Sequence, residues 1–525
     1  MENSKPDEPD KRTAIHCDGV TLDEALSLIR FGKFNYLLIA IAGMIHTAVL
    51  METIGISFVI AVAECDLRMS TQQKGILGAI AYVGIIVSSH LWGFLADTRG
   101  RRKVIVPTLF LASTITLVSS FMSSFWAITV CRFLTGFFIS GASATVYPYL
   151  GEFHSNKTRS RAILGASFVY GFGCLLLPTL PFLVMNQPWD LPIPLLGIVY
   201  RPWRLFLAIC GLPGFVSAVA LLKFPESPKF VFSRGNTEHA IDIIHQIQCM
   251  NSNNKEQIPR LNGIIDDLEI QQSKIHLAEM NNSNGFHALM KLVWKQTAPL
   301  FMEPYMGRTV IMCFLQFGMF LTAHGMYVFF PGILNQMLEA QEAGVNRTTT
   351  CDLIMSRGYS TRGDTAHQQG CSQTLNITTY ELTFILEAIH TVGFAVIGLI
   401  INTVGKLLIM EIVFVCCGIS GIMVIFVDIP LLAIWLYMIL MMGGLSACVT
   451  NTITVDLFPT NLRAMAVSIS LMFGRLGSVT GANMLGLLLD SQCQLTFGIA
   501  GSLMLVCGVI AFFIPNIHKK VNASE

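Results

Sequence analysis

The sequence predicts an all-α membrane protein with twelve transmembrane helices in two bundles of six. Composition is the first observation, because 53% of the 525 residues are hydrophobic and only 13% are charged. A soluble domain carries about 25% charged residues. The second observation is that apolar stretches long enough to cross a bilayer, about 20 residues each, form two groups of six around one long polar interval. An internal repeat is the third.

The expected spans divide the chain into two bundles, a central loop and two tails. The spans lie at roughly 35–62, 73–96, 103–124, 126–150, 161–185, 203–223, 308–330, 380–402, 407–427, 429–453, 462–488 and 495–515. The parts are an N-terminal tail (1–34), a first bundle (35–223), a central loop (224–307), a second bundle (308–515, with a long loop at 331–379) and a C-terminal tail (516–525). Thr21 and Glu24 have capping-box spacing, which predicts a short amphipathic helix in the first tail. The central loop is expected to hold intracellular helices.

The stretch from Gly93 to Lys103, G-F-L-A-D-T-R-G-R-R-K, joins the second and third spans and holds one carboxylate and four cations in seven residues. Lys and Arg are retained on the cytoplasmic side of membranes, so this turn and both termini are expected in the cytoplasm. Its glycines allow a tight reversal and close helix approach. We assign a gating role to the following residues of this stretch: Gly93, Asp97, Arg99, Gly100, Arg101 and Arg102.

Part of this pattern recurs in the second half of the chain. Gly93, Asp97, Gly100 and Arg101 are matched, 305 positions later, by Gly398, Asn402, Gly405 and Lys406. Glu152 and Arg159 are matched, 304 positions later, by Asp456 and Arg463. Two motif pairs at nearly one offset indicate that the halves are structural repeats. The second copy has lost the Asp and most cations, so we expect a weaker gate there.

Charges at other helix ends are candidates for the same gate. We expect one set of charges to form ion pairs across helix ends that close the cytoplasmic side and break during switching: Glu152, Arg159 and Arg161, with Arg99 and Arg102. The alternative is that these charges only set the topology. The remaining gate candidates are Arg132, Glu226, Asp456 and Arg463.

The Gly93 to Lys103 stretch resembles the signature loop of the major facilitator superfamily, G-x-L-a-D-r-x-G-R-[RK]. The segment F-P-E-S-P-K-F, Phe224 to Phe230, is similar to the P-E-S-P-[RK]-[FYW] signature that follows the sixth span of sugar porters, organic-ion transporters and the synaptic vesicle glycoprotein 2 group. Ala25 to Tyr36 resembles the lead-in of that last group. The resemblance implies a transporter whose two bundles rock about a site at the middle of the membrane, in a vesicle or the plasma membrane.

The long loop at 331–379 holds two glycosylation acceptors, Asn346 and Asn376, and two cysteines, Cys351 and Cys371. Glycans and a Cys351–Cys371 disulfide fit an oxidising, non-cytosolic face, with free thiols as the alternative. The vesicle glycoprotein 2 proteins carry their large glycosylated loop at this place, between the seventh and eighth spans.

Ionisable groups inside the spans are costly and indicate function. Glu52, in the first span, matches a family Glu, although the family Asp three residues earlier is Val49 here. Glu52 is expected to bind a substrate cation or exchange a proton, with a structural role as the alternative. Arg132 opens an R-x-x-x-G pattern similar to that of proton-linked facilitators and is either a gate partner or a proton-coupling charge. Arg475 is a candidate counter-ion for Glu387 or for an anionic substrate.

Further pocket candidates are aromatic or lie one helical turn apart. Tyr327 and Phe329 fall in a segment that resembles the aromatic end of the family's seventh span, and Trp435 lies in the tenth span. Their rings are expected to bind a cation or, alternatively, to pack helices together. Glu387 and His390 share one helix face, which favours a proton relay or polar packing.

These observations predict a secondary active transporter of a small organic ion that works by alternating access, with proton coupling as a further expectation. The alternative is a non-transporting membrane protein of vesicles that binds or regulates partners. No Walker loop, nucleophile elbow or metal-site spacing occurs, so we expect no enzyme activity, no metal and no cofactor. We also expect no nucleic-acid partner. The protein is expected to contact membrane lipids and to be a monomer. A hexose carrier is disfavoured, because the seventh span has only Gln316 where sugar porters have a Q-Q-L-S-type run.

Overall fold

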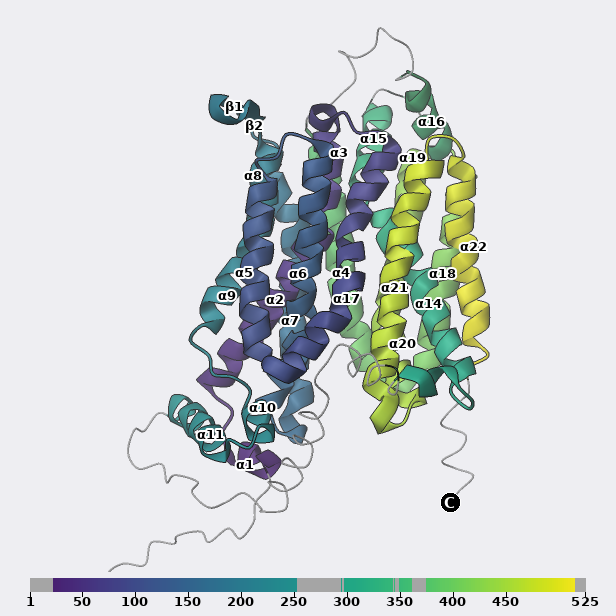
Figure 1. Ribbon diagram of the computed structural model, residues 1–525. Coiled ribbons are helices and arrows are strands. Elements are labelled where there is room, and N and C mark those ends of the chain that lie inside the picture. Colours follow the sequence, from purple (N-terminus) through teal and green to yellow (C-terminus); the bar gives the residue numbers. More distant parts are fainter. Residues whose placement is uncertain are drawn as a thin grey trace, which may run out of the picture.

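The computed structural model describes residues 22–252, 294, 297–342, 344, 349–360 and 374–514 (Figure 1). Within this part, 12 helices are long and apolar enough to cross a membrane. The predicted all-α membrane fold is therefore confirmed. Thr21, Asn346, Cys371, both tails beyond these limits and the expected central-loop helix near 258–275 lie outside the described residues.

The first half of the chain supplies six of the spans and a set of helices at one end. Its elements are α1 Leu22–Leu28, α2 Lys33–Thr53, α3 Ile56–Leu67, α4 Thr71–Arg99, α5 Arg101–Ser119, α6 Phe125–Glu152, α7 Asn156–Met185, β1 Leu191–Ile193, η1 Pro194–Leu196, β2 Ile198–Tyr200, α8 Pro202–Cys210, α9 Leu212–Leu221, α10 Pro228–Ser233 and α11 Thr237–Asn251. The first span is α2 with α3 and the sixth is α8 with α9, each interrupted at a glycine, Gly55 and Gly211. β1 and β2 form an antiparallel hairpin.

The second half repeats this plan with a longer connection after its first span. Its elements are η2 Ala298–Phe301, α14 Met306–Tyr327, α15 Phe330–Glu342, α16 Thr350–Ser360, α17 Ile377–Val404, α18 Lys406–Met423, α19 Pro430–Met441, η3 Met442–Leu445, α20 Ser446–Leu457, α21 Thr460–Leu488 and α22 Cys493–Ala511. The loop expected from 331 thus begins with a helix, α15. Figure 1 shows α1, α10 and α11 at the lower end of the molecule, and α15, α16 and the hairpin at the upper end.

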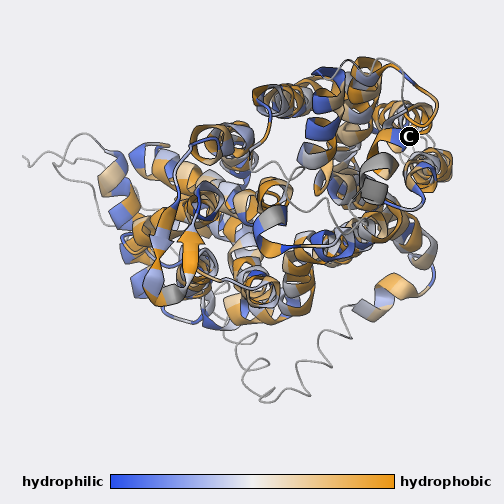
Figure 2. Cartoon of the chain, turned by 90° about the horizontal axis from the view of Figure 1, so that it is seen from above, coloured by the Kyte–Doolittle hydropathy of each residue, from blue (hydrophilic) through white to orange (hydrophobic). Residues whose placement is uncertain are grey.

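Hydrophobic residues, drawn in orange, recur along the helices of both halves in the view from above (Figure 2). Large apolar side chains such as Phe168 and Phe172 on α7 and Leu399 on α17 are exposed. In water such a surface would aggregate, whereas lipid tails solvate it. The surface is therefore that of a protein embedded in a bilayer.

The glycines of the internal repeat occupy equivalent backbone positions. Gly100 ends α4 and precedes α5 with φ of 110°, and Gly405 ends α17 and precedes α18 with φ of 96°. Residues with a Cβ atom disfavour this backbone conformation, whereas glycine adopts it readily. Each half therefore makes the same sharp reversal between its second and third spans.

A polar clasp of Asn35, His154 and Asn251 ties α2, the turn between α6 and α7, and α11 together at the lower end. The Asn35 amide donates to Nε2 of His154 (3.0 Å), and the Asn251 amide donates to Oδ1 of Asn35 (2.8 Å). Nδ1 of His154 lies 2.8 Å from the Leu150 carbonyl oxygen. Both ring nitrogens are thus used, one as donor and one as acceptor, which requires the neutral imidazole.

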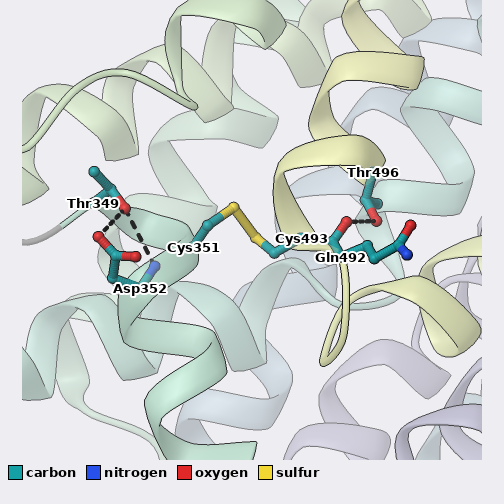
Figure 3. Close-up of a disulfide and its surroundings, with 6 residues drawn as sticks. All are labelled: Thr349, Cys351, Asp352, Gln492, Cys493 and Thr496. Carbon is teal, nitrogen blue, oxygen red and sulfur yellow. Dashed lines mark hydrogen bonds between the residues drawn. A yellow bond between two sulfur atoms is a disulfide. The ribbon is translucent and has the colours of Figure 1, made fainter.

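The predicted Cys351–Cys371 disulfide is wrong, because Cys351 is bonded to Cys493 (Figure 3). The two Cα atoms are 5.3 Å apart, within the range that a disulfide can bridge, although 142 residues separate them in sequence. Cys351 is placed by α16, whose first turn is capped by Thr349 and Asp352. The bond ties α16 to the first residue of the last span.

Lowering the pH below about 6.5, the ordinary histidine pKa, is expected to weaken the clasp. Burial, with a smaller contribution from the Arg159 charge, lowers the pKa of His154. Below pH 6.5 the unfolded chain therefore binds a proton at His154 more readily than the folded chain does. As the pH falls from 6.5 to the lowered pKa, the free energy of unfolding decreases by up to about 1.4 kcal/mol per pH unit. Thermal unfolding of the purified protein at pH 5.5 and 7.5 measures this. His154→Gln should reduce the pH dependence and His239→Gln, at an exposed site on α11, should not; equal pH dependence in all three proteins would contradict the clasp.

Non-reducing peptide mapping should recover a disulfide-linked peptide pair that contains Cys351 and Cys493. Cys493→Ser should lower the free energy of unfolding by about 2–5 kcal/mol, because it removes a cross-link that closes a long loop of the unfolded chain. Cys371→Ser is the matched control and should leave the linked pair intact. Recovery of Cys351 joined to Cys371 would overturn the assignment.

Candidate functional site

A ring of charges surrounds the α4–α5 reversal at the lower end. Arg101 contacts both Asp97 (3.0 Å) and Glu152 (3.1 Å), and its guanidinium lies over the ring of Phe230 on α10. This ring therefore joins α4, α5, the end of α6 and α10 within the first half. Gly93, in contrast, has no neighbouring atom where a Cβ would lie.

Glu226 caps the start of α5. It accepts hydrogen bonds from the backbone N–H groups of Arg102 (3.0 Å) and Lys103 (3.3 Å). A carboxylate at this place offsets the positive end of the helix dipole. Gly100 leaves room for it, since a Cβ there would lie 2.5 Å from the Glu226 carboxylate.

Glu152 forms an ion pair, but the partners predicted for it are wrong. Glu152 pairs with Arg101, whereas Arg102 donates to the carbonyl oxygens of Leu221 and Leu222 at the end of α9. Arg159 donates to the Gly151 carbonyl oxygen (3.2 Å). Arg99 and Arg161 are exposed. These arginines therefore cover helix ends or face the surroundings instead of pairing with Glu152.

The second half carries a reduced copy of the ring. Lys406 forms an ion pair with Asp456, which repeats the Arg101–Glu152 pair at the same places in the repeat. Arg463 follows at the start of α21, partly buried, as Arg159 does at the start of α7. The reduced ring has one described ion pair where the first ring has two.

Glu52 and Arg132 form an ion pair inside the first half. Nη1 of Arg132 lies 2.7 Å from Oε2 of Glu52, and Nη2 donates to the backbone carbonyl of Glu52. The side chains are only 2% and 1% exposed. Glu52 lies one residue before the end of α2, and Arg132 reaches it from α6. A buried pair of this kind is strongly destabilised when one partner loses its charge.

Glu387 lies where the two halves touch at mid-depth. Its Oε1 accepts a hydrogen bond from the Tyr327 hydroxyl (2.7 Å), and its Oε2 is 3.8 Å from Nδ1 of His390. Tyr170 and Cys174, on α7 of the other half, interact electrostatically with it. Among the described residues, no Lys or Arg forms an ion pair with Glu387.

Arg475 belongs to a different cluster from Glu387. It interacts with Tyr82 on α4, whose hydroxyl lies 3.4 Å from Nδ1 of His324. Ser478 lies at the same distance from that nitrogen. The predicted role of Arg475 as counter-ion of Glu387 is therefore not realised in this structure.

Phe329 and Trp435 are not brought to the polar groups. Phe329 is buried in the apolar core at the break between α14 and α15. Trp435 is 41% exposed and shares the outer face of α19 with Leu431 and Ile439. Tyr437, on the opposite face of α19, donates instead to the Met326 carbonyl oxygen (3.0 Å).

The sequence reasoning missed Tyr170, Cys174 and Tyr82 as site residues. Each is an uncharged polar side chain within an apolar span, which is common in membrane helices that have no site. Gly171, next to Tyr170, packs against Thr391 of α17, and this close contact is a signal that only the structure supplies.

The upper end is closed by contacts between the halves. Tyr380, near the start of α17, packs against Phe58 and Phe182 and donates to the Asn186 side chain (3.1 Å). Thr71 donates to Asp490. Among the described residues, no ion pair joins the halves at the lower end.

Gly100→Ala is expected to destabilise the protein more than Gly405→Ala. Both changes place a side chain at positive φ, which costs about 1–3 kcal/mol, but only the first displaces a neighbouring carboxylate, that of Glu226; no atom lies within 4 Å of the Cβ position at Gly405. Gly93→Ala, in a helical and open position, is the control and should be neutral or slightly stabilising. Thermal unfolding of the four proteins measures the order. A larger loss for Gly405→Ala would contradict the role given to Glu226.

Comparisons with known proteins agree with this geometry. A family model described as "Sugar (and other) transporter" matches residues 46–355, more than half of the chain. Human synaptic vesicle glycoprotein 2B is 28% identical over 313 residues, which cover 58% of this chain and 46% of that protein. Rat synaptic vesicle glycoprotein 2A is 27% identical over 318 residues, which cover 58% of this chain and 42% of that protein. The matched region is thus less than half the length of these curated relatives.

Solved structures show the same fold. The inward-open conformation of the xylose transporter XylE from E. coli has a TM-score of 0.62 at 14% identity and covers 92% of this chain and 96% of that one. A partially occluded conformation of XylE has a TM-score of 0.57 at 15% identity and covers 92% and 99%. With the family model, the signature loop and the repeated halves, these matches show that the chain belongs to the sugar (and other) transporter family of the major facilitator superfamily, as a divergent relative of the synaptic vesicle glycoproteins 2.

Proposed function

We propose that this protein is a secondary active transporter that moves a small organic cation by alternating access, coupled to protons. The observation that carries the proposal is the contrast between its two buried carboxylates. Glu52 has a full partner in Arg132, whereas Glu387 has a hydroxyl and a distant imidazole but no described cation. A buried carboxylate without a counter-charge is costly. A cationic substrate or a proton would supply the missing charge.

The surroundings of Glu387 favour an organic cation over a sugar. The Tyr327 hydroxyl donates to Glu387, and Tyr170 and Cys174 are near enough to interact electrostatically with this carboxylate. Aromatic faces and one negative charge suit an ammonium group, whereas a sugar needs several amide and hydroxyl partners. The amide nitrogen of Gln316 donates to Oδ1 of Asn451 (2.8 Å), so this donor is not free for a sugar hydroxyl.

Proton coupling is proposed for the Glu52–Arg132 pair. Protonation of Glu52 removes the charge that compensates Arg132, and a buried unpaired guanidinium then favours a rearrangement that solvates it or gives it another partner. The pair spans α2 and α6 of one bundle, so its state biases how these helices pack. A proton can thereby bias the equilibrium between two conformations of the transporter.

The contacts between the halves support alternating access. The described contacts of Tyr380 and Thr71 seal the upper end, while the charge rings hold the helices of each half together at the lower end. We assign the lower end to the cytoplasm, because it carries the cation-rich reversal, and the upper end to the exterior or lumen, because it carries the disulfide. The structure is then the inward-facing state.

Binding and uptake assays with two Glu→Gln variants test the proposal. Glu387→Gln should weaken binding of choline or tetraethylammonium to the purified protein at least tenfold, about 1.4 kcal/mol, as read from ligand-induced thermal stabilisation. Glu52→Gln should keep binding but lose accumulation of the cation driven by a pH gradient in proteoliposomes. Glu381→Gln, at an exposed position on α17, is the matched control and should behave as wild type.

The result also decides between transport and a non-transporting role. Binding and uptake that do not change in Glu387→Gln would refute the cation site. No binding and no uptake of any cation by well-folded wild type would favour the alternative, a membrane protein that keeps the transporter fold to engage partners. The reduced second charge ring is the feature that fits this alternative.

A further inference from the structure

A separate cavity of about 260 Å³ lies at the upper end, away from Glu387. Its lining comes mainly from the first half: the end of α3, the turn after α7 and the start of α8. Thr374, just before α17, contributes a wall from the second half. The charged, aromatic and hydroxyl-bearing residues of the lining are Asp66, Trp189, Asp190, Arg201, Trp203 and Thr374.

The charges that line this upper cavity leave one carboxylate incompletely paired. Asp66 accepts a hydrogen bond from Nε1 of Trp203 (2.8 Å) through one oxygen and pairs with Arg201 through the other. Asp190 has only a long contact of 3.5 Å to Nε of Arg201, and its side chain is 57% exposed. Two carboxylates and one guanidinium leave the lining with one excess negative charge.

An aromatic ring is fixed next to the free carboxylate. Trp189 precedes Asp190 in sequence, and its ring stacks on Tyr200 with an interplanar angle of 13°. Asp190 directly precedes β1, and the first residue of β1, Leu191, pairs with Tyr200 of β2. The hairpin therefore holds the ring and the carboxylate in one wall, and little conformational entropy is lost when a ligand binds there.

We infer that this upper cavity is a second binding site, specific for a small organic ammonium ion. The Asp190 carboxylate supplies the counter-charge, and the indole of Trp189 supplies a π face of the kind that binds quaternary ammonium groups. The volume accommodates a ligand of the size of choline or tetramethylammonium. A bare divalent cation does not fit this description, because the Arg201 guanidinium already stands between the two carboxylates.

Choline binding to the full-length, detergent-purified Glu387→Gln variant tests the inference, since that background weakens the site near α17. Isothermal titration should show saturable choline binding, and its neutral isostere 3,3-dimethylbutan-1-ol should bind at least tenfold more weakly. Asp190→Asn and Trp189→Leu in the same background should each weaken choline binding at least tenfold. Asp190→Glu should restore part of the affinity, and the exposed Glu381→Gln change should have no effect.

Three results would overturn the second site: no saturable choline binding in the Glu387→Gln background, equal affinity for choline and its isostere, or unchanged affinity in Asp190→Asn. Size-exclusion profiles and thermal unfolding confirm that the variants are folded. The difference in choline affinity between wild type and Glu387→Gln measures the contribution of the site at α17 separately. A failure of the upper cavity can thus be told from a failure of the proposed transport site.

Discussion

The absence of water from the bilayer interior is the constraint on which this structure depends. Every buried charge must find its partner within the protein, because lipid supplies none. Arg132 does so with both a carboxylate and a backbone carbonyl of α2. The pair therefore links two helices of the first bundle, and Glu52 lies next to the break between α2 and α3. Glu387 has only a hydroxyl and a distant imidazole as partners. It is therefore the candidate group for binding an exchangeable cation or proton.

The two halves share one plan but differ in how firmly their lower ends are held. Gly100 and Gly405 make the same reversal, and Arg101–Glu152 is matched by Lys406–Asp456. Within the described residues, only the first copy adds a carboxylate that caps the following helix, and this carboxylate comes from the segment after the sixth span. The first bundle also carries the clasp and α11.

The upper end shows how small and aromatic residues together close a seam. Gly75 of α4 lets the backbone of α21 approach so closely that a Cβ would lie 2.5 Å from the Ala482 carbonyl oxygen. Tyr380 fills the neighbouring space between Phe58 and Phe182. Neither contact involves a buried ion pair, so the seam can open without leaving an unpaired charge. That property distinguishes it from the Glu52–Arg132 contact inside one half.

Hydropathy, span length and the repeated charge motif were enough to determine the fold class, the twelve spans and the equivalence of the halves, because each of these is a local property of the chain. Glu52, Arg132, Glu387 and Tyr327 were likewise recognisable as candidates, since a charge or a motif stands out in an apolar run. Which groups pair was decided only by the tertiary structure: Glu52 with Arg132, Glu387 with Tyr327, and Cys351 with Cys493 rather than with its neighbour in sequence. Helix rotation and packing bring such groups within bonding distance, and neither can be read from spacing along one helix. The prediction that Trp435 lines the pocket failed for the same reason: the rotation of α19 turns Trp435 outward and Tyr437 inward.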